Sequence, residues 1–218
     1  MQGFNMFSVT KEKITKELLL YRQFKESFEF KPSDIIDVDG IQYCDGLPIQ
    51  DEEGKYISEC EKWINVGYKI KGSLSKLLSN LYPYEFVFRG FRLKSIESFF
   101  QAIKFNDPAI QQMVFVYSGT DAYHIQKASS YNWKETGYIY WQGQAIKRDS
   151  EEYDLLVDEV YIAALQNPLY RQAVKNTTKP IIHSIGKLLK SETVFTRYEF
   201  ERQINSLSAF LKHLDEDI

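Results

Sequence analysis

The fold is decided by residues 88–105, which read Phe-Arg-Gly-Phe-Arg-Leu-Lys-Ser-Ile-Glu-Ser-Phe-Phe-Gln-Ala-Ile-Lys-Phe. Apolar side chains alternate on either side of Arg89-Gly90, a spacing that predicts two short antiparallel strands joined by a turn. After Ser95 the apolar spacing becomes i, i+3, i+4, i+7, which predicts a helix capped by this serine and running through Phe105. A hairpin that leads directly into a helix favours a mixed α+β fold.

Three polar residues share a second face of this predicted helix. Glu97, Gln101 and Lys104 follow one another at i, i+4 and i+7. The free N–H groups of the first turn favour an ionised Glu97, whereas burial under aromatic rings would raise its pKa. A carboxyl group between these influences can exchange protons near neutral pH. Spacing alone favours an ordinary solvated face, and both interpretations stay open.

Outside this stretch the chain is predicted to be mainly helical, with a second small hairpin that turns at Asp39-Gly40. No repeat or membrane-spanning run is present. We therefore expect an α+β domain at residues 71–218, with an N-terminal helix and β-rich elaboration at residues 1–70 packed on it. Further helices are expected from a Thr10 cap to before Pro32, from Asp107-Pro108 to Gly119, from Asp149 to Asn167, from Pro168 to about Asn176, and over residues 200–214.

Composition narrows the class of protein. The 218 residues carry a net charge of −3, which disfavours strong, sequence-independent binding to nucleic acid. Two cysteines and three scattered histidines show no metal-ligand spacing, so no metal or cofactor is expected. The N-terminus lacks the pattern of a signal peptide, which favours a cytoplasmic protein without membrane contact. An aromatic content of 15% suits either a tyrosine-rich core or a cleft that stacks on planar ligands.

These motifs resemble a known family. Leu-Ser-Asn-Leu-Tyr-Pro at residues 78–83, followed by the 88–105 stretch, is similar to the signature of the NADAR (YbiA-like) family. Arg148-Asp149 before a helix, and Gln-Asn-Pro-Leu-Tyr-Arg at 166–171, resemble its second block. The resemblance spans roughly residues 74–214 and implies hydrolysis of a bond between ribose C1 and a nitrogen. Residues 1–70 have no counterpart in it.

The resemblance also implies a set of site residues. Glu97 would be the catalytic carboxylate, Gln101 and Lys104 would support it, and Asn80 would position the ribose or base. Arginines match phosphate oxygens, so a diphosphate is expected to meet cations near the site. Asp149 is counted with the substrate-binding residues, although its place before a helix also fits an N-cap. The expected phosphate-binding cations are Lys104, Arg89, Arg92 and Arg148.

One part of the chain departs from the family pattern. Where many members carry a Trp-Gly loop, residues 179–198 lack it, and His183 stands where a glutamate is common. The ring-dense stretch 131–141, including Trp141, is the expected substitute for stacking on the base. A loop anchored to the core by its aromatic rings is the alternative. His183 is a candidate acid or base, although a lone histidine is more often structural.

Three functions remain open. The preferred one is an N-glycosidase that removes ADP-ribose from guanine in DNA or nucleotides, paired with an ADP-ribosyltransferase toxin as an antitoxin or a phage counter-defence protein. The second is an N-glycosidase acting on phosphorylated intermediates of riboflavin biosynthesis. The third is a non-catalytic module that binds ADP-ribose, in which the missing loop marks lost chemistry.

Overall fold

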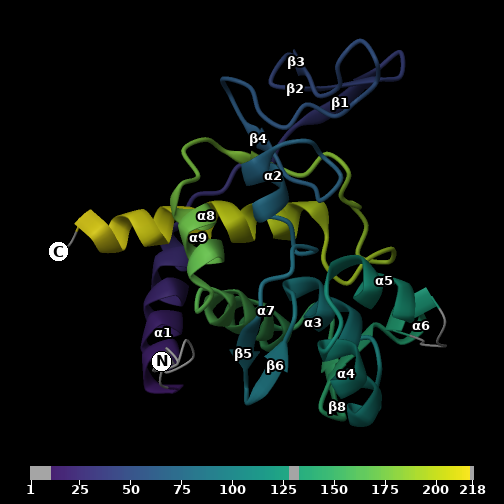
Figure 1. The fold of residues 1–218 in the computed structure, drawn as a ribbon, viewed down its shortest axis with the longest axis vertical. Helices are drawn as coiled ribbons and strands as arrows, with labels where there is room; N and C mark the ends of the chain where they lie inside the picture. The colour runs from purple at the N-terminus through teal and green to yellow at the C-terminus, as the bar shows by residue number, and fades with distance from the viewer. Residues whose placement is uncertain (1–10, 128–132, 217–218) are drawn as a thin grey trace, which may run out of the picture. The chain divides into compact units, whose positions relative to one another are not determined.

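The structure, a computed structural model, describes residues 11–127 and 133–216 (Figure 1). Contacts divide the chain into two compact units. Unit 1 comprises the described part of residues 1–26 and residues 83–171, and unit 2 comprises residues 27–82 and the described part of 172–218. Both contain helices and short strands, so the predicted α+β class is confirmed. Each unit combines segments from both sides of residue 70, and the domain boundary expected there stays a prediction.

Unit 1 is organised around α3 (Ile96–Ala102), the short helix predicted after Ser95. It packs against α4 (Pro108–Phe115), α5 (Gly119–Lys127) and α7 (Glu151–Ala164). The hairpin predicted to turn at Arg89-Gly90 is confirmed. The remaining elements of this unit are β5 (Phe86–Phe88), β6 (Phe91–Leu93), α6 (Trp133–Thr136), β7 (Tyr138–Trp141), β8 (Gln144–Lys147), α1 (Lys11–Ser27) and the first half of α8 (Pro168–Lys175).

Aromatic rings form the core beneath α3. Trp141 lies at their centre, with its ring centroid 4.9 Å from Phe88, 5.9 Å from Phe91, 6.1 Å from Phe99 and 5.8 Å from Phe115. All four pairs meet edge-on or tilted, the geometry that ring quadrupoles favour. The aromatic richness of unit 1 therefore fills its interior, as one of the two interpretations of composition predicted.

The alternative prediction for the ring-dense stretch, a loop anchored to the core, is wrong in its secondary structure for the described part, although Trp133 and Trp141 are buried. Residues 133–136 form α6, and β7 pairs antiparallel with β8 from Tyr138 opposite Lys147 to Trp141 opposite Gln144. Gln142 (φ 48°) and Gly143 (φ 84°) make the tight turn between them. Tyrosine, isoleucine and tryptophan favour strands, but a Gln-Gly turn is a weak hairpin signal. Residues 131 and 132 lie outside the described residues.

Several predicted helix ends shift by a few residues. α3 stops at Ala102 rather than at Phe105, and Lys104 follows in a turn. Gly119 was expected to end a helix, but it begins α5 instead. Asp149 does not cap α7, because the Oγ of Ser150 accepts the N–H of Tyr153, 3.2 Å away. α1 ends at Ser27, before Pro32 as predicted, while its expected cap Thr10 lies outside the described residues.

Unit 2 begins with the predicted hairpin. β1 (Ile35–Val38) pairs with β2 (Ile41–Cys44), and Asp39 (φ 53°) and Gly40 (φ 82°) form the turn. The inner face packs on a cluster of Cys44, Ile49, Trp63 and Ile182. The other elements are β3 (Leu47–Pro48), β4 (Ile64–Asn65), α2 (Ser73–Leu77), the second half of α8, β9 (Ile181–Ile182) and α9 (Arg197–Glu216). Over the described ranges, no helix is long and apolar enough to cross a bilayer.

Candidate active site

The cap of α3 fixes where the candidate site begins. Ser95 Oγ accepts the backbone N–H of Ser98 at 3.1 Å, and Ser98 Oγ reaches back toward the N–H of Ser95. The same Ser95 oxygen accepts the N–H of Gly119, 3.1 Å away, which ties the start of α5 to the start of α3. Ser95 is fully buried. Glu97 is therefore held in the first helical turn, as predicted.

Glu97, Gln101 and Lys104 meet in one chain of hydrogen bonds. Lys104 Nζ donates to Gln101 Oε1 over 2.6 Å, and Gln101 Nε2 donates to Glu97 Oε1. An ammonium group only donates hydrogen bonds, so the Gln101 carbonyl must face Lys104 and its NH₂ must face the carboxylate. Both Gln101 and Lys104 are buried, with 3% and 7% of their surface exposed. The shared face predicted from spacing is thus a connected network.

Burial shifts the proton affinities of both ends of this network. Glu97 is partly exposed, yet its surroundings desolvate the carboxylate enough to raise its pKa above the ordinary value. The hydrogen bond from Gln101 and the charge of Lys104 act in the opposite direction and are weaker. Burial lowers the pKa of Lys104 to about 8, against the attraction of Glu97, and the positive charge of Lys134 lowers it further. The pKa of Glu97 is thus raised and that of Lys104 lowered, so both move toward neutral pH.

This arrangement suits general acid–base chemistry. Its raised pKa lets the Glu97 carboxyl group hold a proton to higher pH than an ordinary glutamate does, and its partial exposure leaves it in reach of a bound molecule. Gln101 fixes its orientation, and Lys104 places a positive charge behind the amide. Two carboxylates at one site are not required, because the protonated and ionised forms of a single group can act in turn.

Arg148 and Asp149 lie in unit 1 as well, with different surroundings. Arg148 is 4% exposed, and its guanidinium carbon lies 4.2 Å from the centre of the Tyr153 ring. Its backbone N–H donates to the carbonyl of Gly137 over 2.9 Å. Asp149 is exposed in the turn before α7. Arg148 is therefore a structurally held cation, and binding of phosphate by either residue stays a prediction.

Arg89, Arg92 and Trp141 all have partners within unit 1. Arg89 forms a forked ion pair with Glu159, with Nη2 2.6 Å from Oε2, and its guanidinium lies 5.7 Å above the Trp141 ring. Arg92 Nη1 lies 2.8 Å from Glu85 Oε1 at an exposed position. Trp141 is only 5% exposed. A substrate would have to compete with these ion pairs, and stacking of a base on Trp141 would need the core to open.

Asn80 and His183 belong to unit 2. Asn80 is half-buried in the turn after α2. His183 Nδ1 lies 2.7 Å from the carbonyl oxygen of Val66, which can only accept, so Nδ1 carries the proton. Burial lowers the pKa of His183, and the backbone N–H of this residue donates to Glu201 over 2.8 Å. The ring is neutral and structurally held, and a part in catalysis stays a prediction.

With this geometry in hand, comparison with known proteins decides the family. The sequence model of a protein family described as bacteriophage protein GP30.3 matches residues 72–209, well over half of the chain. The chain belongs to the GP30.3 family. This is a NADAR/YbiA-like family, so the resemblance inferred from the sequence is confirmed. The chain is also similar to the E. coli protein YbiA, solved by NMR, at 14% identity and a TM-score of 0.47 over 78% of this chain and 95% of that one. No curated protein matches.

Within the GP30.3-family region, sequence reasoning missed one supporting residue. Gln111 on α4 is fully buried, and its Nε2 donates to the carbonyls of Phe105 (2.6 Å) and Tyr140 (2.9 Å). Its Oε1 accepts the backbone N–H of Gln142 over 3.0 Å. Gln111 thereby fastens the chain directly after Lys104 to the β7–β8 hairpin. Its place on a partly apolar helix gives no sequence signal for this role.

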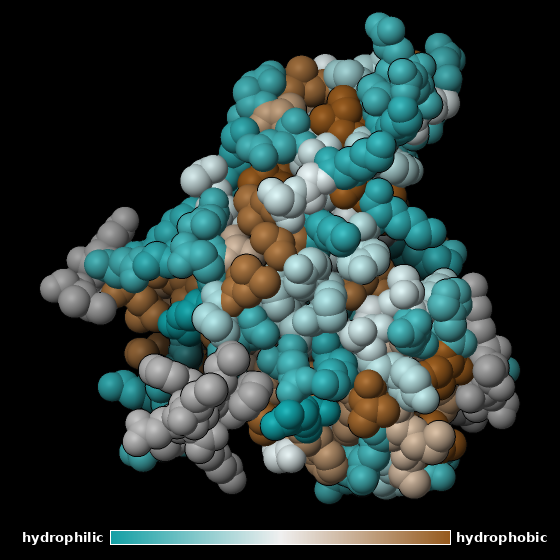
Figure 2. Space-filling model, in the orientation of Figure 1, coloured by the Kyte–Doolittle hydropathy of each residue, from teal (hydrophilic) through white to brown (hydrophobic). Residues whose placement is uncertain are grey.

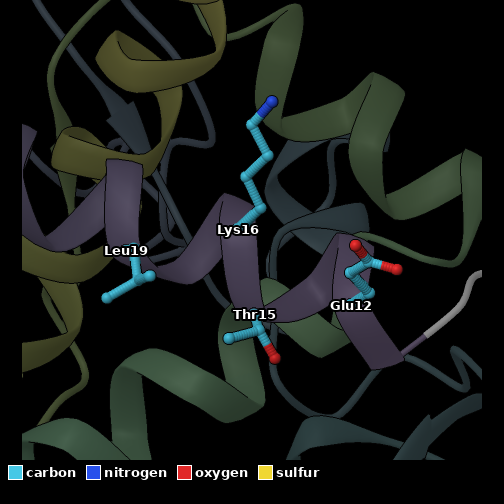
Figure 3. Close-up of a pocket in the computed structure, with 4 residues that line it drawn as sticks. All are labelled: Glu12, Thr15, Lys16 and Leu19. Carbon is cyan, nitrogen blue, oxygen red and sulfur yellow. The ribbon is translucent and has the colours of Figure 1, made fainter.

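Two further features bear on ligands. Among residues 11–127 and 133–216, no three histidine, cysteine, aspartate or glutamate side chains converge as metal ligands would. A surface hollow lies along α1, outside the matched 72–209 region, and its described lining is Glu12, Thr15, Lys16 and Leu19 (Figure 3). These four side chains are exposed on a single helix, and they offer no buried polar group to select a ligand.

Proposed function

We propose that this GP30.3-family protein is an N-glycosidase that hydrolyses a ribose C1–N bond, with Glu97 as the catalytic group. The observation that carries the proposal is the network from Lys104 through Gln101 to Glu97, in which burial raises the pKa of a partly exposed carboxyl group. NADAR/YbiA-like proteins are generally N-glycosidases, which supports the same reaction class.

The reaction requires one proton acceptor and one proton donor. As the C1–N bond breaks, its electron pair leaves with the nitrogen and positive charge builds on the ribose. An ionised Glu97 stabilises that charge and takes a proton from the water whose oxygen bonds to C1. Protonated Glu97 then gives that proton to the departed nitrogen, which restores the carboxylate, so that the hydroxyl group of water ends on C1 and its proton on the nitrogen. Gln101 holds the carboxylate in place throughout.

We further propose that the substrate is guanine carrying ADP-ribose, in DNA or in a free nucleotide. The departure of residues 179–198 from the family pattern supports a substrate other than the small metabolite. Lys104 and Arg148 are the buried cations of unit 1 that suit a diphosphate. The family takes its description from a bacteriophage protein, which supports a role in countering an ADP-ribosyltransferase toxin.

The net charge of −3 limits how such a protein would meet DNA. Contacts should be confined to the modified base and a few neighbouring phosphates, so affinity should fall only gently with salt. Because C1 is not accessible in a stacked duplex, the modified nucleotide must be extruded or already single-stranded.

Product analysis tests the proposal. Purified protein is incubated with an ADP-ribosylated guanine oligonucleotide and, separately, with the phosphorylated amino-pyrimidine intermediates of riboflavin synthesis. Release of ADP-ribose with recovery of unmodified guanine supports the proposal. Turnover of the pyrimidine compounds alone identifies the metabolite enzyme instead. ADP-ribose binding by calorimetry without turnover of either substrate identifies a non-catalytic module.

A further inference from the structure

The β1–β2 hairpin carries large apolar side chains on its outer face. The strand register places Ile36 opposite Tyr43 and Val38 opposite Ile41. Because side chains alternate between the faces of a strand, these four lie on one face as two cross-strand pairs. Ile36, Val38 and Ile41 are 51%, 49% and 45% exposed. Scattered apolar residues are ordinary at a protein surface, but a contiguous set of this kind marks an interaction site.

The hairpin's opposite face holds it in place. Ile35 and Cys44 lie directly across from each other and belong to the apolar cluster of unit 2 around Trp63. The indole N–H of Trp63 donates to the carbonyl of Cys44 over 3.3 Å. The outer face therefore belongs to an anchored hairpin, so binding a partner would cost little entropy for ordering this surface.

The segment around this face is strongly acidic. Residues 33–62 contain nine carboxylates and two lysines, a net charge of −7, so the rest of the chain carries +4. All nine carboxylates are exposed. Figure 2 shows hydrophilic and apolar residues side by side over β1–β3, at the top of the view. The carboxylates are Asp34, Asp37, Asp39, Asp45, Asp51, Glu52, Glu53, Glu59 and Glu61.

β1 also offers a sheet edge. Ile49 N–H donates to the carbonyl of Gln42 over 2.8 Å, so the backbone of Gln42 points toward β3 and away from β1. In an antiparallel pair, residues opposite each other point their backbone groups in opposite directions, so Asp37 faces the outer edge. Within the described ranges, β1 is paired with β2 alone.

We infer that this face binds a cationic protein partner, which adds an extended, lysine- or arginine-rich strand to the edge of β1. Apolar side chains of that strand would lie beside Ile36 and Val38, and its cations would meet exposed carboxylates of residues 33–62, such as Asp37 on the same strand. Residues 33–62 belong to unit 2 and lie outside the matched region 72–209, whereas Glu97 belongs to unit 1 and lies within it.

Charge argues against the other occupants. A second copy would place the same net charge of −7 against itself, and charged edge strands discourage pairing of identical copies. Nucleic acid and anionic lipid would be repelled for the same reason. A cationic protein strand is the occupant that satisfies the apolar face, the carboxylates and the open edge together.

A model peptide tests the inference with the full-length protein. The probe is acetyl-Lys-Val-Lys-Ile-Lys-Val-Lys-amide, titrated against ¹⁵N-labelled protein, with the Glu-for-Lys peptide as the matched control. We expect the cationic peptide to perturb amide signals of residues 35–43 and its affinity to fall with salt, as exposed charge pairs require.

Two sets of variants locate the effect. Asparagine replaces Asp37 and Asp39 of the hairpin, and Asp34 just before β1. This keeps the turn, because asparagine tolerates the positive φ of Asp39 and still accepts the Gly40 N–H at position 37. This triple variant should bind the cationic peptide about fivefold more weakly or worse. A control set removes equal charge from exposed positions of unit 1 and should bind as the wild type does. The triple hairpin variant combines Asp34→Asn, Asp37→Asn and Asp39→Asn. The control variant combines Glu26→Gln, Asp121→Asn and Glu152→Gln.

The outcomes separate cleanly. Binding of the cationic peptide that weakens in the hairpin variant and persists in the control set supports the inference. Absence of binding at millimolar peptide overturns it, as does equal binding of the anionic peptide. Dimerisation in sedimentation experiments that Ile36→Thr with Val38→Thr abolishes would also overturn it, because the occupant would then be a second copy.

Discussion

Replacing Glu97 with glutamine separates a catalytic carboxylate from a structural one. The substitution is nearly isosteric, and the new amide oxygen still accepts the hydrogen bond from Gln101 Nε2. It removes the negative charge and the exchangeable proton. We expect a loss of at least ~100-fold in turnover, equivalent to about 2.7 kcal/mol of transition-state stabilisation. The assay is release of ADP-ribose from modified guanine under single-turnover conditions.

The same substitution should leave stability unchanged or improve it. The pKa of Glu97 is raised in the folded protein, so folding favours the protonated form. The stabilisation that Glu97 contributes is greatest at low pH. It is lost as the pH rises from the ordinary pKa of glutamate through the raised pKa of Glu97 in the folded protein. At neutral pH the buried charge thus opposes folding, and Glu97→Gln removes that opposition.

Thermal unfolding at pH 7.5 supplies the second readout. We expect the unfolding temperature of Glu97→Gln to be no more than ~1 °C below that of the wild type, and it can be higher. Glu152 is an exposed carboxylate on α7, and Glu152→Gln is the matched control, which should change neither turnover nor the unfolding temperature. Turnover within threefold of wild type (about 0.6 kcal/mol) would refute the catalytic role, and a clear loss of stability would refute the electrostatic argument.

Three other predictions follow from unit 1. If protonated Lys104 is required, kcat/KM should fall as the pH rises through about 8, where burial has placed its pKa. Lys104→Arg, which stays charged, should move that limb to higher pH, and an unmoved limb would assign it to another group. Ser95→Ala removes the cap of α3 and should lower the free energy of unfolding in urea by about 1–2 kcal/mol, whereas no change would show that the cap is dispensable. A double-mutant cycle of Arg89→Ala and Glu159→Ala should give a coupling energy of about 0.5–1 kcal/mol, and zero coupling would mean that the forked pair does not persist in solution.

Patterns within a few residues predicted the local structure well. Asp39-Gly40 and Arg89-Gly90 are tight turns between short strands, and both hairpins form as expected. The i, i+4, i+7 spacing grouped Glu97, Gln101 and Lys104, and they are joined by hydrogen bonds, although Lys104 lies in the turn after α3. Local geometry decides these features, so the sequence alone was sufficient.

Features that depend on distant partners were less predictable. The Trp141 stretch was expected either to stack on a base or to be a loop anchored to the core, but Trp141 lies in a strand that pairs with β8, and its ring is buried against four phenylalanine rings. Gln111 holds three backbone groups that no local pattern connects to it. The cap of α7 moved by one residue, from Asp149 to Ser150, because neighbouring residues with side-chain oxygens compete for the same position.

The central claim is that the protein hydrolyses a ribose C1–N bond through Glu97. The most direct measurement is a single-turnover reaction in H₂¹⁸O with ADP-ribosylated guanine, followed by mass spectrometry of the sugar product under conditions that limit spontaneous exchange. We predict one ¹⁸O atom in the released ADP-ribose with the wild-type protein and no released product with Glu97→Gln. Labelled product at equal rates from both proteins, or none from the wild type, would contradict the account.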